Sequence, residues 1–156
     1  MNVVTTPAAQ LRGFLSKYQP ETATQARRAL AKVRALLPGA TELVYDNYNA
    51  LVVGFGPSDR ASEAVVSLAI FPKWVTLCFL QNGPRIPDPE KVLQGAGNVV
   101  RHVRLASAED LDKPAVRRLI RETLRMAEVP IKRSAKGRMV IKSVSGKQRP
   151  RRVSRV

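Results

Sequence analysis

The chain has few of the residues that build disulfide frameworks and metal centres. Among its 156 residues there is one cysteine, Cys78, and one histidine, His102. A single cysteine cannot form an internal disulfide, and a single histidine without a cysteine cluster cannot hold zinc. The composition therefore predicts neither a metal site nor a bound cofactor. The low use of cysteine favours a cytoplasmic protein.

The sequence also lacks long apolar runs and a secretion signal. No stretch of 18 or more consecutive apolar residues occurs, so we expect no membrane span. The first residues, MNVVTTPAAQLRG, lack the basic segment followed by an apolar segment that marks a secretory signal. Both observations lead us to expect no contact with a membrane.

Familiar catalytic patterns are missing as well. No G-x-S-x-G sequence is present to support a Ser-His-Asp arrangement. The stretch QGAGNVVRHVRL at 94–105 has two of the three glycines of a dinucleotide-binding loop. However, a helix is expected before it and a strand after it, the reverse of the order that such a loop needs. We expect a plain turn instead, in which Gly95 caps a short helix beginning near Asp88 and Gly97 leads into the strand. Since no set of side chains indicates a reaction, an enzymatic role stays open but is not favoured.

Acidic residues are scarce, and the excess of positive charge is unevenly spread. The chain has 27 Lys and Arg against 12 Asp and Glu, a net charge of +15. Ten of the basic residues and no acidic residue lie in 131–156, which leaves 17 basic and 12 acidic residues, or +5, in 1–130. This division predicts a single folded domain over 1–130 and a basic, disordered tail over 131–156.

Hydrophobic periodicity predicts an α+β fold. Apolar residues recur at helical spacing after Thr6, from Pro20 to Leu37 and from about Asp112 to Glu128. Short β-branched and aromatic runs predict four strands and then a fifth: TELVY, ALVVGF, AVVSLAIF, WVTLCFL and NVVRHVRL. Because short or middling loops join the first four, we expect an antiparallel sheet of about five strands with N-terminal and C-terminal helices packed on it. The run AVVSLAIF, apolar on both faces, is expected at its centre.

Polar and aromatic residues gather near the ends of the predicted strands and form one candidate site. The YDNYN stretch at 45–49 either forms a hairpin turn or is a polar rim over a pocket, with Asp46 facing Arg101. Along the fifth strand, alternation places Arg101 with the aliphatic residues and His102 with Arg104 on the other face. Structural roles for these side chains are the simpler interpretation. The candidate ligand-binding residues are Tyr45, Asp46, Tyr48, Trp74, Arg101 and His102.

Arginines suggest a second, electrostatic surface. Three lie four residues apart on the last predicted helix and form one stripe, and others lie in the tail. Such a surface could bind nucleic acid non-specifically and with a strong dependence on salt. The tail contains no aromatic residues, so base stacking is not predicted for it. The candidate nucleic-acid contacts are Arg117, Arg121, Arg125, Arg149, Arg151 and Arg152.

Three stretches together resemble the YdhG-like family, a bacterial domain of unknown function. They are VYDNYNALVVGFGP, FLQNGPRIPDPEKVLQGAGNVVRHVRL and the helix LDKPAVRRLIRETL, so the resemblance covers about residues 20–128. It implies an α+β fold with an antiparallel sheet and flanking helices, and no established enzymatic role. Some members of the family are described as frataxin-like iron chaperones. The acidic ridge that iron delivery needs is not evident here, since only Glu109, Asp110 and Asp112 cluster.

These observations lead to three alternative functions. The first is a non-enzymatic domain that binds a small ligand or a protein near a sheet edge. The second is a nucleic-acid-associated protein that uses its basic tail, and the third is an iron chaperone. Exposed sheet edges also make a homodimer a reasonable expectation.

Overall fold

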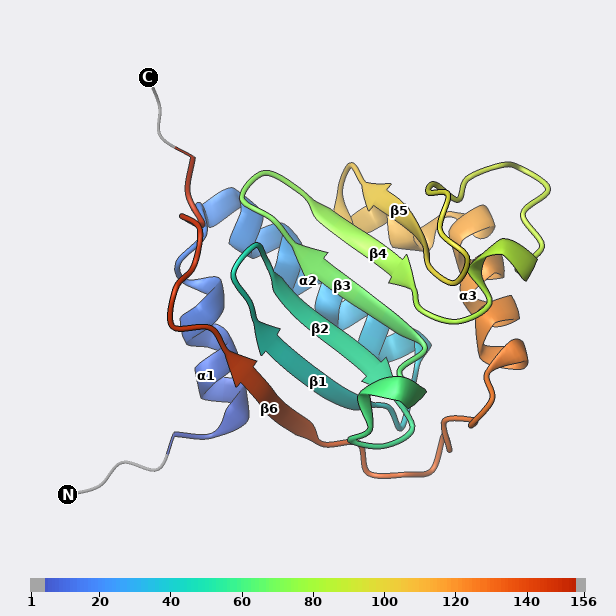
Figure 1. Cartoon of the computed structure of the whole chain (residues 1–156), viewed down its shortest axis with the longest axis horizontal. Coiled ribbons are helices and arrows are strands. Elements are labelled where there is room, and N and C mark those ends of the chain that lie inside the picture. The colour runs from blue at the N-terminus through green and yellow to red at the C-terminus, as the bar shows by residue number, and fades with distance from the viewer. Residues whose placement is uncertain (1–4, 154–156) are drawn as a thin grey trace.

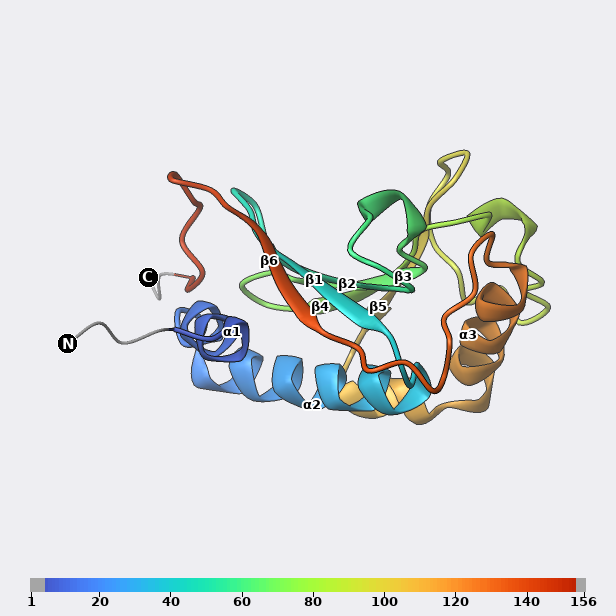
Figure 2. The same ribbon diagram turned by 90° about the horizontal axis from the view of Figure 1, so that it is seen from below.

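A computed structural model describes residues 5–153 of the chain. The described chain forms three helices on one side of a six-stranded sheet (Figures 1 and 2). The helices are α1 (Pro7–Leu15), α2 (Pro20–Leu36) and α3 (Pro114–Met126). The strands are β1 (Thr41–Asp46), β2 (Leu51–Gly56), β3 (Val66–Ile70), β4 (Val75–Phe79), β5 (Arg101–Leu105) and β6 (Met139–Val144). The predicted α+β class is therefore confirmed.

The helices begin where the sequence signals placed them. Each of the three starts with a proline, a residue that has no N–H to leave unpaired in the first turn. The hydroxyl of Thr6 caps α1 by accepting a hydrogen bond from the Ala9 N–H at 3.1 Å. One predicted helix is absent, because the chain after Asp88 forms turns, in which the Asp88 carboxylate accepts hydrogen bonds from the Val92 and Leu93 N–H groups. Gly95 has a positive φ of 112°, but it lies in this loop rather than at a helix end.

The sheet has the order β5-β4-β3-β2-β1-β6. Strands β1 to β5 form an antiparallel meander, as predicted, and every residue of β3 is buried in its middle. The sixth strand was not predicted. It pairs with β1 in parallel, so the sheet is mixed rather than purely antiparallel.

The structure corrects the expectation of a disordered tail over residues 131–156. Residues 139–144 are β6, and residues 145–153, which we call the C-terminal segment, fold back beside the β1–β2 turn and the end of α1 (Figure 1). The Arg149 N–H donates to the Tyr48 carbonyl at 2.8 Å. The Arg151 side chain is buried, and only 4% of that residue is exposed. The basic sequence is therefore part of the fold as far as residue 153.

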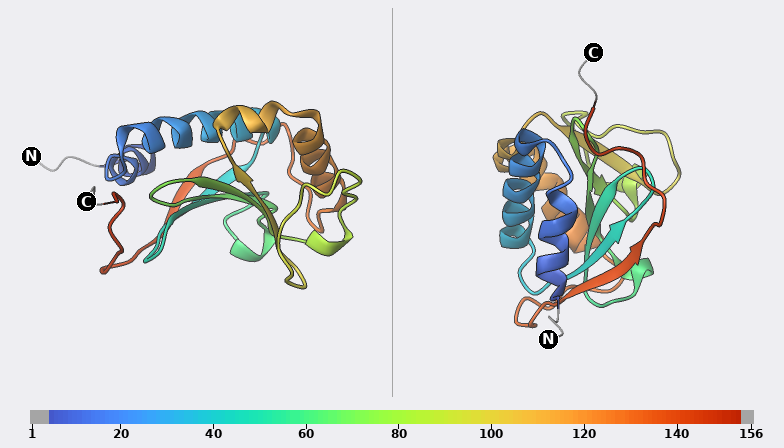
Figure 3. Two further views of the ribbon diagram at one scale, coloured as in Figure 1. Left: turned by 90° about the horizontal axis from the view of Figure 1, so that it is seen from above. Right: turned by 90° about the vertical axis from the view of Figure 1, so that its left-hand side faces the viewer.

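The two faces of the sheet have different surroundings. One face packs against α1 and α2 and carries most of the core, including Val44, Val53, Leu68, Leu77 and Phe79. No α-helix among residues 5–153 covers the other face, which we call the open face (Figure 3, left). The β2–β3 and β4–β5 connections and the C-terminal segment rise beside it (Figure 2). Side chains that point to this face are available for contacts outside the domain.

Candidate functional site

Cross-strand register decides which of the predicted site residues share the open face. Tyr45 pairs with Val52, Val52 with Ala69, Ala69 with Thr76, and Thr76 with Arg104. Paired residues point to the same side of a sheet, so these five side chains form a row across the open face. His102 pairs with Cys78 and lies on the same face, one row away.

Two neighbouring hollows lie on the open face. One, of about 940 Å³, extends from the β1–β2 turn to the β3–β4 turn, and the other, of about 550 Å³, extends along β4 and β5. They share Ala69, Phe71 and Trp74, so we treat them as one groove and call it the open-face groove. Its remaining lining residues are Asn47, Tyr48, Asn49, Ala50, Val52, Pro72, Thr76, Cys78, Gln94, His102, Arg104, Ser145, Arg149 and Pro150. Among these residues there is no aspartate or glutamate.

The aromatic rings of the groove are paired with arginines. The guanidinium carbon of Arg104 lies 3.9 Å from the centre of the Trp74 ring, and that of Arg149 lies 5.5 Å from the centre of the Tyr48 ring. The Phe71 ring lies 5.6 Å from Trp74. An arginine at such a distance over an aromatic face is held by a cation–π interaction. Both arginines are exposed, so their charges and the outer faces of their guanidinium planes stay open to a ligand.

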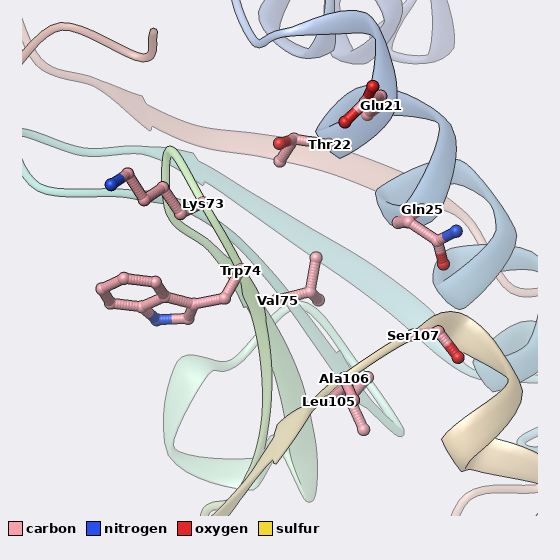
Figure 4. A pocket seen from close by; sticks show the side chains of 9 residues that line it. All are labelled: Glu21, Thr22, Gln25, Lys73, Trp74, Val75, Leu105, Ala106 and Ser107. Carbon is pink, nitrogen blue, oxygen red and sulfur yellow. The ribbon is translucent and has the colours of Figure 1, made fainter. Parts of the chain in front are cut away.

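Trp74 reaches the groove because strand alternation turns it away from the core. Val75 follows it and is buried on the helix-covered face, so Trp74 points to the opposite side. Figure 4 shows the indole directed away from Glu21, Thr22 and Gln25 of α2.

Those α2 side chains line a smaller pocket of about 190 Å³ between the start of α2 and the ends of β4 and β5. Two of its polar groups are already used within the fold. The Thr22 hydroxyl donates to the Pro72 carbonyl, and the Gln25 side chain accepts from the Ala108 N–H. These hydrogen bonds join α2 to the β3–β4 turn and to the segment after β5, so the small pocket offers fewer free polar groups to a ligand than the open-face groove.

The structure separates Asp46 from the other candidate ligand-binding residues. Asp46 pairs with Leu51 and points to the helix-covered face, where its side chain is fully buried. The predicted pairing with Arg101 is wrong. Asp46 binds Arg151 at 2.9 Å and Lys17 at 2.7 Å instead. Burial alone would raise the pKa of Asp46, but hydrogen bonds from Lys17, Gln148 and Arg151 outweigh burial and lower this pKa below its usual value.

Arg101 also lies outside the groove. It lies at the start of β5 on the helix-covered side, and its guanidinium donates to the backbone carbonyls of Gly97 and Val100. Its place on the aliphatic face of the strand agrees with the alternation in the sequence, but its partners are carbonyl groups rather than a carboxylate. Tyr45, Tyr48, Trp74 and His102 are thus brought together on the open face, without Asp46 and Arg101.

The candidate nucleic-acid residues divide in a similar way. On α3, Arg117 pairs with Asp112 and Arg125 with Glu122, whereas Arg121 has no carboxylate partner among the described residues. The three C-terminal arginines have three different surroundings. Arg149 lies over Tyr48, Arg151 is buried against Asp46, and Arg152 donates to the Ser16 and Lys17 carbonyls.

Sequence reasoning missed Phe71 and Arg104 as groove residues. The sequence did indicate the place of Arg104, because this residue lies two positions after His102 on β5 and therefore points to the same face of the sheet. Phe71 lies in the β3–β4 turn, where alternation no longer specifies a side. The Tyr48–Arg149 pair had no signal, because it depends on the folding of the C-terminal segment.

Cys78 and His102 lie side by side in the groove but form no metal centre by themselves. Within residues 5–153, no group of three or more His, Cys, Asp or Glu side chains is placed to hold a metal ion. Burial raises the pKa of the Cys78 thiol, so the thiol form predominates at neutral pH. No helix in the described part of the chain is long and apolar enough to cross a membrane.

Comparisons with known proteins identify no relative of this chain. No protein-family model, no curated protein and no solved structure matches this chain. The resemblance to the YdhG-like family therefore stays a prediction from the sequence, and the function is argued from the open-face groove.

Proposed function

We propose that the chain is a binding domain whose open-face groove recognises an anionic ligand that carries flat conjugated rings, of the nucleotide class. The observation that carries the proposal is the double pairing of ring and guanidinium, Trp74 with Arg104 and Tyr48 with Arg149. Rings and guanidinium planes offer surfaces for a base, and the two charges attract a phosphate.

The electrostatics of the groove support this ligand class. No carboxylate lines the groove among the described residues, so an anion meets no local repulsion there. The chain as a whole carries a net charge of +15, which adds a long-range attraction for anions. A ligand without charge could stack on the rings and the guanidinium planes but would gain nothing from the charges of the arginines.

This proposal unites two of the three functions expected from the sequence. The small-ligand site keeps Tyr48, Trp74 and His102, and the basic C-terminal sequence contributes Arg149 to the same groove. The iron-chaperone alternative has no supporting cluster of acidic, histidine or cysteine ligands in residues 5–153.

The experiment compares a nucleotide with its two halves. AMP, adenosine and ribose 5-phosphate are titrated separately into the full chain, and binding is followed by the fluorescence of Trp74, the single tryptophan. We expect AMP to quench this fluorescence and to bind about tenfold or more tightly than either half, since stacking and charge each contribute roughly 1–3 kcal/mol. Equal affinity for AMP and ribose 5-phosphate would mean that the rings do not take part.

A matched pair of variants locates the site. Arg104→Ala should weaken AMP binding, whereas Arg27→Ala should leave it unchanged, because Arg27 is an exposed arginine on α2, across the sheet from the groove, without a carboxylate partner among residues 5–153. If the two variants weaken binding equally, the charge of the whole surface rather than the groove binds the ligand.

A further inference from the structure

The open-face groove contains two separate stacking sites rather than one. The Tyr48–Arg149 pair belongs to the β1–β2 turn and the C-terminal segment, and the Trp74–Arg104 pair belongs to the end of the β3–β4 turn and to β5. The cross-strand register places the β1–β2 and β3–β4 turns at the same end of the sheet. Since β2 and β3 lie between β1 and β4, the two sites are about two to three strand spacings apart, roughly 10–15 Å.

We propose that the natural ligand of the groove is a single-stranded nucleic acid that crosses the strands and places different bases on the two sites; this inference rests on the proposed function. A single base can stack on only one of the two rings, because stacked rings lie about 4.5–7 Å apart whereas the two sites are roughly 10–15 Å apart. A chain of a few nucleotides is needed to occupy both sites at once. The two hollows adjoin through Phe71 and Trp74, so such a chain meets a continuous surface.

The groove suits a single strand better than a duplex. The bases of a duplex are stacked on one another and cannot present a free face to a protein ring, whereas the bases of a single strand can be splayed out. The arginines of the groove lie over the rings themselves, 3.9 Å and 5.5 Å from the ring centres, so they are placed where the bases of the ligand arrive.

The salt dependence of binding distinguishes a strand bound in the groove from one bound by all the basic residues of 131–156. Arg149 and Arg104 line the groove that the single strand would cross, and the exposed Lys73 precedes Trp74 in the chain, so two or three cations can contact phosphates. For a single strand this corresponds to a salt slope, d log K/d log [salt], of about −1.4 to −2.1. If all ten basic residues of 131–156 bound phosphates, the slope would be about −7.

Length dependence is the decisive experiment. Fluorescently labelled oligouridylates of one, two, four and eight nucleotides, and an eight-base-pair RNA duplex, are titrated into the full chain, with binding measured by anisotropy and by quenching of Trp74. We expect the affinity to rise steeply between one and about four nucleotides, because the second stacked base adds roughly 5- to 150-fold. The duplex should bind more weakly than the single strand of equal length.

Variants assign the two sites. Tyr48→Ala should weaken binding of the four-nucleotide strand about tenfold or more while changing the affinity for UMP by less than twofold, since a mononucleotide can still use the Trp74 site. Arg27→Ala, which removes an exposed arginine from α2 on the other side of the sheet, serves as the control for lost charge and should change neither affinity. A circular dichroism spectrum equal to that of the unchanged chain shows that Tyr48→Ala is folded.

The outcomes separate this inference from the proposed function. If UMP and the longer strands quench Trp74 with the same affinity, the groove binds mononucleotides and the inference is overturned, while the proposed function stands. Tighter binding of the duplex, or a salt slope near −7, also overturns it. If neither UMP, AMP nor any oligonucleotide alters the Trp74 fluorescence or the anisotropy, both proposals fail.

Discussion

Removing one member of the buried pair of Asp46 and Arg151 should strongly destabilise this fold, and replacing Arg151 by alanine tests this directly. The Arg151 guanidinium donates to the Asp46 carboxylate at 2.9 Å, to the Asn47 carbonyl at 2.5 Å and to the Tyr48 carbonyl at 3.3 Å. Both side chains are withdrawn from water, with exposures of 3% for Arg151 and 0% for Asp46. Alanine removes all three hydrogen bonds and leaves the carboxylate with fewer partners.

The magnitude follows from what remains around Asp46. Removing one member of a buried ion pair costs about 3–5 kcal/mol. Asp46 keeps the Lys17 ammonium at 2.7 Å, and the Nε atom of Arg151 has no hydrogen-bond partner within residues 5–153, so the loss should lie near the lower limit. We expect Arg151→Ala to lower the free energy of unfolding by about 3 kcal/mol, and Tm by about 6–12 °C in a chain of this size.

The assay is thermal and urea unfolding, followed by circular dichroism and by Trp74 fluorescence. Arg149→Ala is the matched control, since Arg149 is an exposed arginine two residues away whose side chain lies over the Tyr48 ring, and its loss should change the unfolding free energy by no more than about 1 kcal/mol. Asp46→Asn and the double variant complete a double-mutant cycle, in which a coupling energy above about 1 kcal/mol is expected. A loss below about 0.5 kcal/mol for Arg151→Ala would refute the interpretation of the C-terminal segment as an anchored part of the fold.

Four further predictions concern the same framework. Deleting residues 131–156 removes β6 and Arg151 and exposes the edge of β1, so the truncated chain should unfold at a lower urea concentration than the full chain and show earlier loss of its circular dichroism signal. The pKa of Asp46 in the folded chain lies below its unfolded value of about 3.9. The stabilising contribution of Asp46 is therefore present above that pH and is lost as the pH falls through the lower folded pKa. The free energy of unfolding of Asp46→Asn should accordingly depend less on pH between about 5 and 3 than that of the unchanged chain. A Cβ atom at Gly137 would meet the Ala40 carbonyl oxygen at 2.0 Å, so Gly137→Ala should lower Tm by several degrees in differential scanning calorimetry. The Thr123 hydroxyl is buried and has no hydrogen-bond partner in the described part of the chain, so Thr123→Val should leave stability unchanged or raise it by up to about 1 kcal/mol in urea unfolding.

The parts of the fold that local patterns specify could be predicted from the sequence. Proline at the helix starts and the hydroxyl of Thr6 determine where the helices begin, since these groups act within a few residues of the chain. The alternation of the strands and the short or middling loops between the first four predict the meander, and the alternation of β5 separates Arg101 from His102 correctly.

The C-terminal strand could not be predicted in this way. Its six residues, MVIKSV, include a short apolar run and then a lysine and a serine, and they are surrounded by basic residues typical of a disordered tail. What orders them is a parallel pairing with β1 and an ion pair between residues 105 positions apart in the sequence. Such long-range contacts leave no periodic pattern nearby, and the error about the tail also concealed the Tyr48–Arg149 half of the groove.

Because β6 is the last strand in the chain, the open-face groove is completed late in synthesis. Strands β1 to β5 and the helices leave the ribosome before β6, and domains generally begin to fold from their N-terminal part. A nascent chain that ends after α3 already has the Trp74 site, but it lacks the partner strand of β1, the buried Arg151 that binds Asp46 together with Lys17, and Arg149. The complete groove therefore forms only after the C-terminal segment has docked, so a truncated translation product would lack both the anchor at Asp46 and the second stacking site.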